Sequence, residues 1–310
     1  PAATIAIGSR GAGSAACGDY LAFSPDGKRL AVITPDSFFL VNLTTRQRIF
    51  FTVNGTKPII EGTYVGSYVA FSPDGRFLVT NDGGDFDVWD TTGGTLLQNF
   101  GGGRLQSSNS APAYSPDGTL LALGQSGNDV ALVNGHDFSP IATLHGPTAP
   151  AYYVVQVAFS PDGKTLAALS VGGAITLWQV QTRTLIGSFQ ALTTSNTLSN
   201  CLAFSPDNHM VAACLGMTFG LWYVATREPV IAPQRADTYV PNLTFSPDGR
   251  LLAETTLNGP LFVRYATLPL WQAQACAIAD RNFTRTEWRQ IFDTEPYQQV
   301  CPNLPVPPAS

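Results

Sequence analysis

The chain has 310 residues and a formal net charge of −5, and Lys, Arg, Asp and Glu make up only 13% of it, about half the share usual in globular proteins. No run of Lys or Arg could supply the phosphate contacts on which nucleic-acid binding depends, so the composition argues against a nucleic-acid partner. No window approaches the roughly 18 apolar residues of a membrane span. The scarcity of charge favours an exported, extracytoplasmic or cell-surface protein over a cytoplasmic one.

Tight turns of one kind recur along the chain. The first, Phe-Ser-Pro-Asp-Gly, occupies residues 23–27, and the others occupy residues 71–75, 114–118, 159–163, 204–208 and 245–249. Serine opens a β-turn, proline presets φ at its second position, and the last residue must adopt positive φ. Glycine holds that last position except at Asn208, and asparagine is among the few residues that tolerate the left-handed region. The chain is therefore a repeat protein with intervals of 41 to 48 residues.

Apolar, β-prone residues flank each turn, as at 20–23 and 30–33, so each copy predicts a hairpin. A third strand is expected around a residue 18 or 19 positions after the turn aromatic, and its constant phase predicts packing between neighbouring sheets. These residues are Val41, Trp89, Val133, Trp178, Trp222 and Val263. A fourth apolar run closes most units, at 48–53, 95–100, 139–144 and 183–189. Four strands per unit predict an all-β fold, a β-propeller of four-stranded antiparallel blades.

Two motifs point to a family. FSPDG-type turns occur six times, and several third strands end in DVWD (87–90), LWQV (177–180) or LWYV (221–224). In these features residues 1–270 resemble a bacterial WD-repeat β-propeller, and the related periplasmic propellers with SPDG repeats are the neighbouring alternative. The family's Gly-His pair survives only as LHG at 144–146, and its Trp-Asp pair only at Trp89 and Asp90. The resemblance therefore implies the blade fold, without the family's buried Asp, Ser and His network.

Both termini are expected to close the ring. The sixth unit has a hairpin at 240–255 and a third strand at 260–266, whereas residues 268–271 contain a proline and make a poor fourth strand. Residues 3–8 form an apolar run with no hairpin of its own, and we expect them to supply the outermost strand of the last blade. This closure predicts six blades. Seven blades, the alternative, would require residues that the sequence does not contain.

The repeat pattern ends at residue 271. Residues 271–282 predict a helix, and Thr284 and Glu287 form a capping box for a second helix over 285–292. Prolines then predict an extended end at 302–308. This segment resembles a tail found after the propeller in bacterial WD-repeat proteins, including those attached to signalling NTPases and Ser/Thr kinases. The predicted domains are a propeller over residues 1–270 and a helical, disulfide-tied, Pro-rich tail over 271–310.

None of the five cysteines has the spacing of a zinc site. Cys276 and Cys301 bracket the tail, and we predict a disulfide between them in an oxidising compartment. Cys201 and Cys214 lie almost equidistant from the fifth turn and could be cross-strand neighbours, although two unpaired buried cysteines are the favoured interpretation. Cys17 is then the odd cysteine.

Catalytic and ligand motifs are weak. GAGSAACG (11–18) matches a dinucleotide loop, but a hairpin rather than a helix follows it, so we interpret it as a connector. A cluster of three aspartates could suggest a calcium site, but a turn between two strands is the favoured interpretation. These are Asp82, Asp85 and Asp87. The three histidines, His136, His145 and His209, fall in separate predicted blades, and no nucleophile is paired with a base. We therefore expect no catalytic residues, no metal and no cofactor.

A partner surface is expected on one rim. Strand direction reverses at each turn, so the six short and nearly identical turns share one rim, while the longer and more varied loops share the other. Tyrosine and arginine are favoured interface anchors. The candidates in these loops are Tyr64, Arg104, Tyr152, Tyr153, Arg235 and Tyr239. The expected function is a non-catalytic protein-interaction scaffold or recognition module of a larger bacterial assembly. Its expected partners are other proteins, with copies of itself as a further option. The alternative is a small-molecule binder, hydrolase or lyase that uses the central channel.

Overall fold

The structure is a computed structural model, and it describes residues 20–34, 37–52, 68–81, 85–100, 110–148, 150, 152–192, 200–240, 242–255, 260–266, 276, 279, 281–292, 297 and 299–306. Among these residues the regular structure is β-strand, apart from one short 3₁₀ turn, η1 (Ser126–Asn128), and helical residues in the tail. The prediction of an all-β fold built from four-stranded antiparallel sheets is confirmed.

Six antiparallel sheets follow one another along the described part of the chain, and within each sheet the strands pair in chain order. The first sheet contains β1 (Tyr20–Phe23), β2 (Arg29–Thr34), β3 (Ser37–Asn42) and β4 (Arg48–Phe50). The second contains β5 (Tyr68–Phe71), β6 (Phe77–Asn81), β7 (Phe86–Asp90) and β8 (Leu96–Asn99). The third contains β9 (Ala113–Tyr114), β10 (Leu120–Gly124), β11 (Val130–Asn134) and β12 (Pro140–Leu144).

The remaining sheets have the same design. The fourth contains β13 (Val154–Phe159), β14 (Thr165–Ser170), β15 (Ala174–Gln179) and β16 (Thr184–Gln190). The fifth contains β17 (Asn200–Phe204), β18 (Met210–Leu215), β19 (Thr218–Tyr223) and β20 (Pro229–Arg235). The sixth has three described strands, β21 (Asn242–Phe245), β22 (Leu251–Thr255) and β23 (Phe262–Tyr265).

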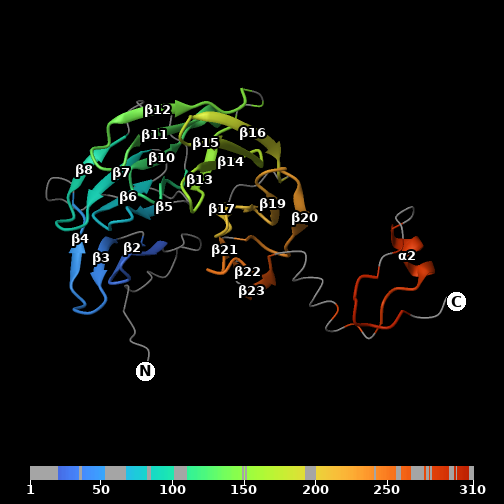
Figure 1. Ribbon diagram of the computed structural model, residues 1–310. Helices are drawn as coiled ribbons and strands as arrows, with labels where there is room; N and C mark the ends of the chain where they lie inside the picture. The colour runs from blue at the N-terminus through green and yellow to red at the C-terminus, as the bar shows by residue number, and fades with distance from the viewer. Residues whose placement is uncertain are drawn as a thin grey trace.

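The sheets stand side by side along an arc (Figure 1), and the first strand of each sheet contacts the first strand of the next. Each sheet therefore has a leading face, toward the preceding sheet, and a trailing face, toward the following one. Apolar side chains from a trailing face and the next leading face form one buried cluster. Leu177 of the fourth sheet and Trp222 of the fifth belong to such a cluster. Burial of these side chains is the main force that holds the array together.

The turns adopt the predicted backbone. The last residue has positive φ in all six, from 65° at Asn208 to 74° at Gly118. In the fourth turn the Ser160 hydroxyl donates to Asp162 Oδ1 at 2.7 Å and accepts from the Thr165 amide at 2.9 Å. The serine is buried, so these bonds satisfy a polar group that would otherwise be costly to bury. The same serine–aspartate bond recurs in the other five turns.

Two strand predictions need correction. The third-strand position of the sixth sheet belongs to Arg264, not Val263, because Leu252 pairs with Arg264 as Val211 pairs with Trp222 in the fifth sheet. Arg235, predicted to lie in a loop, is the last residue of β20. This strand contains Pro229 and Pro233, which it can tolerate because it is the outermost strand of its sheet.

The favoured interpretation of the two hairpin cysteines was also wrong. Cys201 and Cys214 pair directly across β17 and β18, and a disulfide joins them. Their Cα atoms are 4.9 Å apart, within the range that a disulfide spans. Residues 3–8, the predicted closing strand, and residues 11–18 lie outside the described residues, and the six-blade closure stays a prediction.

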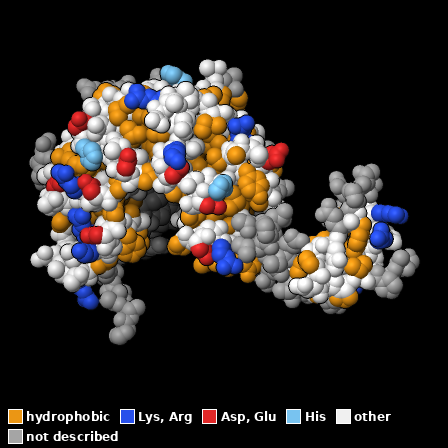
Figure 2. Space-filling view, in the orientation of Figure 1, with side chains coloured by type: hydrophobic (Ala, Val, Ile, Leu, Met, Phe, Trp, Pro, Cys, Tyr) orange, Lys and Arg blue, Asp and Glu red, His pale blue; other side chains and the backbone are white. Residues whose placement is uncertain are grey.

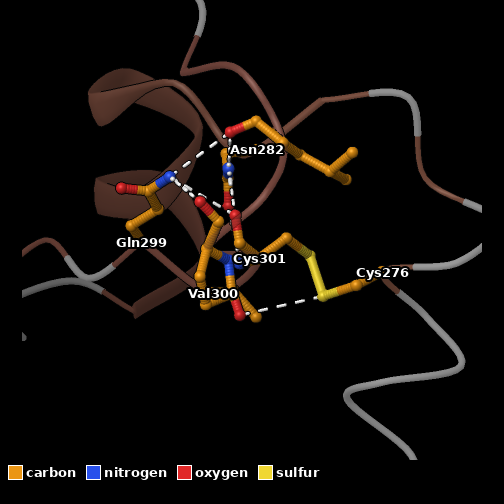
Figure 3. Close-up of a disulfide and its surroundings, with 7 residues drawn as sticks. Cys276, Asn282, Gln299, Val300 and Cys301 are labelled. Carbon is orange, nitrogen blue, oxygen red and sulfur yellow. Dashed lines mark hydrogen bonds between the residues drawn. A yellow bond between two sulfur atoms is a disulfide. The ribbon is translucent and has the colours of Figure 1, made fainter.

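The tail contains the predicted second helix, α2 (Arg285–Phe292), with its capping box intact: the Thr284 amide donates to Glu287, and the Glu287 amide donates to the Thr284 hydroxyl. A disulfide joins Cys276 to Cys301. Next to it, Asn282 Nδ2 donates to the carbonyls of Cys301 and Leu304 at 2.8 and 2.7 Å (Figure 3). The helix capping box, the disulfide and the hydrogen bonds of the buried Asn282 amide therefore stabilise the fold of the tail. The predicted first helix falls largely outside the described residues.

Candidate interaction surface

The strand order places two kinds of connection on opposite rims. The Ser-Pro-Asp-Gly turns and the connections between third and fourth strands form one rim, called here the turn rim. The connections between second and third strands and those between sheets form the other, called here the loop rim. This follows from the alternating strand direction of the sheets and agrees with the sequence prediction.

The turn rim is used for packing between sheets. A Cβ placed on Gly118 would lie 3.5 Å from Cδ of Pro73 in the preceding turn, and one on Gly163 would lie 3.6 Å from Cδ of Pro116. Where asparagine replaces glycine, the Asn208 side chain accepts a hydrogen bond from the Asp162 amide of the preceding turn at 2.9 Å. The repeated turns therefore contact one another and link neighbouring sheets.

Hydrogen bonding also fixes the charge of the turn aspartates. The Ser160 hydroxyl first, and the Lys164 amide in addition, lower the pKa of Asp162 below its ordinary value. The pKa of the equivalent aspartate is lowered in every other turn. Acidic and basic side chains are spread along the array rather than gathered in one patch (Figure 2). The described residues of this face therefore form no single-sign patch that would favour a polyanion.

On the loop rim, a fixed platform lies where the third and fourth sheets meet. Its centre is the segment that connects β12 to β13 and carries Tyr152 and Tyr153, which are 38% and 40% exposed. The Asn128 amide donates to the Tyr152 carbonyl at 2.7 Å, and the Val171 amide donates to the Tyr153 carbonyl at 3.0 Å. The two tyrosines are therefore held from both sheets while their rings remain open to solvent.

The position of the Tyr152 ring depends on the absence of a side chain at Gly172. A Cβ on Gly172 would lie 2.2 Å from Tyr152 Cε2, so the ring rests directly on the β14–β15 turn and any larger residue would displace it. An aromatic ring held against backbone loses little further conformational freedom on binding, which favours affinity.

Polar side chains brace the same connection. Asn128 Nδ2 donates to the carbonyls of Pro147 and Pro150 at 2.8 and 2.9 Å. Asp129 Oδ1 accepts from the Gly146 amide at 3.1 Å, and its Oδ2 lies 3.0 Å from His145 Nδ1. Sequence reasoning missed this group of supporting residues, because an Asn-Asp pair in a turn gives no signal of which distant carbonyls it will hold.

The other predicted contact residues divide into two groups. Arg235 ends β20 on the loop rim, is exposed, and lies 3.8 Å from the Met217 sulfur through Nη2. Tyr239 lies four residues further on and is partly buried. The structure therefore has Tyr152, Tyr153, Arg235 and Tyr239 on the loop rim. Tyr64 and Arg104 lie outside the described residues.

No group of three or more His, Cys, Asp or Glu side chains that could hold a metal occurs in the described part of the chain. His136 and His145, expected in separate blades, lie on the two connections that flank one strand of the third sheet, β12, and therefore beyond its opposite ends. Asp87 accepts a hydrogen bond from Asn99 at 2.7 Å, and Asp82 lies outside the described residues. The described helix α2 is too short to cross a membrane, and no other described helix is long and apolar enough.

Comparison with known proteins identifies the repeat. A family model described as "WD domain, G-beta repeat" matches residues 138–179. This segment comprises β12 of the third sheet and β13–β15 of the fourth, so the sequence repeat spans the boundary on which the tyrosine platform lies. The chain contains a WD40 repeat.

Several WD-repeat proteins are similar to this chain. It is 28% identical over 161 residues to Intraflagellar transport protein 122 homolog of Xenopus tropicalis, an alignment that covers 52% of this chain and 13% of that protein. It is 28% identical over 109 residues to Small ribosomal subunit protein RACK1 of Schizosaccharomyces pombe, covering 32% of this chain and 33% of that protein. WD repeat and HMG-box DNA-binding protein 1 of Homo sapiens is 25% identical over 178 residues, 52% of this chain and 15% of that protein. The alignments span a third or less of each of these relatives.

Proposed function

We propose that this chain is a non-catalytic protein-interaction module, the recognition or scaffold part of a larger bacterial assembly, and that its partner binds the loop rim of the third and fourth sheets. The observation that carries the proposal is the pair of exposed tyrosines on a backbone braced from two sheets. Rigid aromatic anchors surrounded by polar groups are typical of protein-binding hot spots. Similarity to WD-repeat proteins supports the same conclusion.

A matched pair of variants tests this surface. Tyr152→Ser with Tyr153→Ser removes both anchors, and Tyr223→Ser removes a tyrosine of equal exposure, 40%, at the turn-rim end of β19. Because hot-spot anchors contribute about 2 kcal/mol or more, the double variant should bind the native partner about 30-fold more weakly, and Tyr223→Ser should bind normally. The dissociation constant is measured with each full-length variant immobilised. Normal binding by the double variant, with weak binding by Tyr223→Ser, would contradict the proposal.

We also propose an extracytoplasmic location. Two disulfides, Cys201–Cys214 in a sheet and Cys276–Cys301 in the tail, support it, because structural disulfides persist in oxidising compartments. Thiol titration of the protein taken from its native source, alkylated at lysis, should find both pairs oxidised. Four or more free thiols in that material would contradict the proposed location.

A further inference from the structure

The tyrosine platform, Tyr152 and Tyr153 with the connections that meet beside them, carries almost no charge. The described residues of these connections are 125–129, 145–148, 150, 152–153 and 171–174. They contain no Lys, Arg or Glu, and their one carboxylate, that of Asp129, lies 3.0 Å from His145 Nδ1. Charged partners are selected by complementary charge, so this surface favours an uncharged ligand.

The groups that the platform presents narrow the chemistry further. The carbonyls of Pro147, Pro150, Tyr152 and Tyr153 already accept hydrogen bonds from the residues that brace the connection. The exposed tyrosines present ring faces and phenol hydroxyls, which donate hydrogen bonds. A proline-rich segment in the polyproline II conformation matches both, because its rings are apolar and its carbonyls are free of internal hydrogen bonds. Aromatic side chains are the usual receptors for such segments.

The same chain contains a ligand of this kind. Residues 302–310 read Pro-Asn-Leu-Pro-Val-Pro-Pro-Ala-Ser, with four prolines and no charged residue. Pro302 and Pro305 have the P-x-x-P spacing of segments that dock on aromatic side chains. Pro305 is exposed, and Val306 is 43% exposed. The segment therefore presents apolar groups to solvent.

The base of this segment is held in place by the tail. The Asn282 amide donates to the Pro305 carbonyl at 2.9 Å. Gln299 Nε2 lies within hydrogen-bond distance of the carbonyls of Pro302 and Leu304, at 3.2 and 3.3 Å. The disulfide at Cys301 adjoins Pro302 (Figure 3). A ligand and a receptor that are both fixed before they meet lose less conformational freedom on binding.

The two surfaces are open within one chain. Tyr152 and Tyr153 are exposed, as are Pro305 and Val306, and the described tail residues lie apart from β12 and β13 (Figure 1). We propose that the tyrosine platform binds the proline-rich segment 302–308 of a second copy of this chain, an inference that rests on the loop-rim site proposed above. The contact is heterologous, because different surfaces of the two copies meet, so association extends from one copy to the next.

Sedimentation equilibrium of the full chain tests this association. The parent should form species that grow with concentration. Tyr152→Ser with Tyr153→Ser, and separately Pro305→Ala with Pro307→Ala, should each weaken association about 30-fold, as expected for loss of hot-spot anchors. Two exposed turn-rim residues supply matched controls: Tyr223→Ser and Pro247→Ala should associate as the parent does. A parent that stays monomeric up to millimolar concentration, or a double variant that associates as the parent does, would overturn the proposal.

Mixing the two double variants gives a sharper result. The proline variant keeps an intact platform, and the tyrosine variant keeps an intact segment. Each alone should stay monomeric, whereas the mixture should form a one-to-one dimer that does not grow further. A misfolded variant could not restore association in this way. A mixture that stays monomeric would overturn the proposal.

Binding of the native partner is a separate measurement. If the parent is monomeric while Tyr152→Ser with Tyr153→Ser loses the native partner, the self-association proposal fails and the proposed function stands. If that double variant associates and also binds the native partner as the parent does, both proposals fail.

Discussion

Replacing Tyr114 by phenylalanine should stabilise the protein. Tyr114 is the one turn aromatic that is not phenylalanine, and it packs against the cluster between the second and third sheets. Its hydroxyl is buried, and it is the one buried side-chain polar atom without a hydrogen-bond partner among the described residues. Such a group costs about 1 to 3 kcal/mol. The ring is only partly buried, so we expect a gain near the lower end, about 1 kcal/mol.

Denaturant unfolding of the full chain measures this gain. Tyr114→Phe should raise the midpoint with an unchanged slope, because the surface exposed on unfolding stays the same. Tyr152→Phe is the matched control: its ring is 38% exposed, and exposed substitutions usually fall within about 0.5 kcal/mol of the parent. A lower midpoint for Tyr114→Phe would show that the hydroxyl has a partner and would refute the reasoning.

Alkaline pH should amplify the difference. Burial first, and the nearby Asp74 charge in addition, raise the pKa of Tyr114 well above its ordinary value of 10.0. A group whose pKa is raised by folding contributes stability that is complete below the unfolded pKa and is lost as pH rises toward the folded pKa. The parent should therefore lose stability above about pH 10, and Tyr114→Phe should lose less of it. Unfolding midpoints at neutral and alkaline pH make this comparison.

Three further predictions follow from particular contacts. Gly172→Ala should displace the Tyr152 ring and weaken partner binding about tenfold, a loss of ~1.4 kcal/mol, measured with the same immobilised chain; unchanged affinity would contradict the role given to this ring. Asp162→Asn should reduce acid sensitivity, because the lowered pKa of Asp162 contributes stability that is lost as pH falls below about 4; melting at neutral and acidic pH tests it, and equal acid losses would speak against it. Arg264→Met should cost about 3 to 5 kcal/mol, because Glu254, 1% exposed, would lose its ion pair; a urea midpoint within error of the parent would rule this out.

Local chemistry explains why the repeat could be predicted. The positive φ of Gly163 and Asn208 follows from the residues of the turn itself. The hairpins follow from apolar residues on either side of each turn, and α2 begins where its capping box predicts. In each case the determining residues lie within a few positions of one another.

What the sequence did not reveal depends on register and on distant partners. Counting from the sixth turn could not detect that Arg264 rather than Val263 aligns with Leu252. No fourth strand was predicted for the fifth unit; β20 contains two prolines, and their tolerance depends on the strand being outermost. The bond between Cys201 and Cys214 depends on their direct pairing across two strands. The loop-rim platform depends on contacts between two sheets.

Exposure of equivalent residues is the most direct test of the sheet array. Hydroxyl-radical footprinting with mass spectrometry reports side-chain oxidation at each position of the intact chain. Leu177 and Leu221, buried between sheets, should be protected, whereas Leu261 and Val263 on the sixth sheet should be oxidised. Protection of Leu261 and Val263 to the level of Leu221 in the isolated chain would contradict the account, because these side chains are 62% and 56% exposed in the structure.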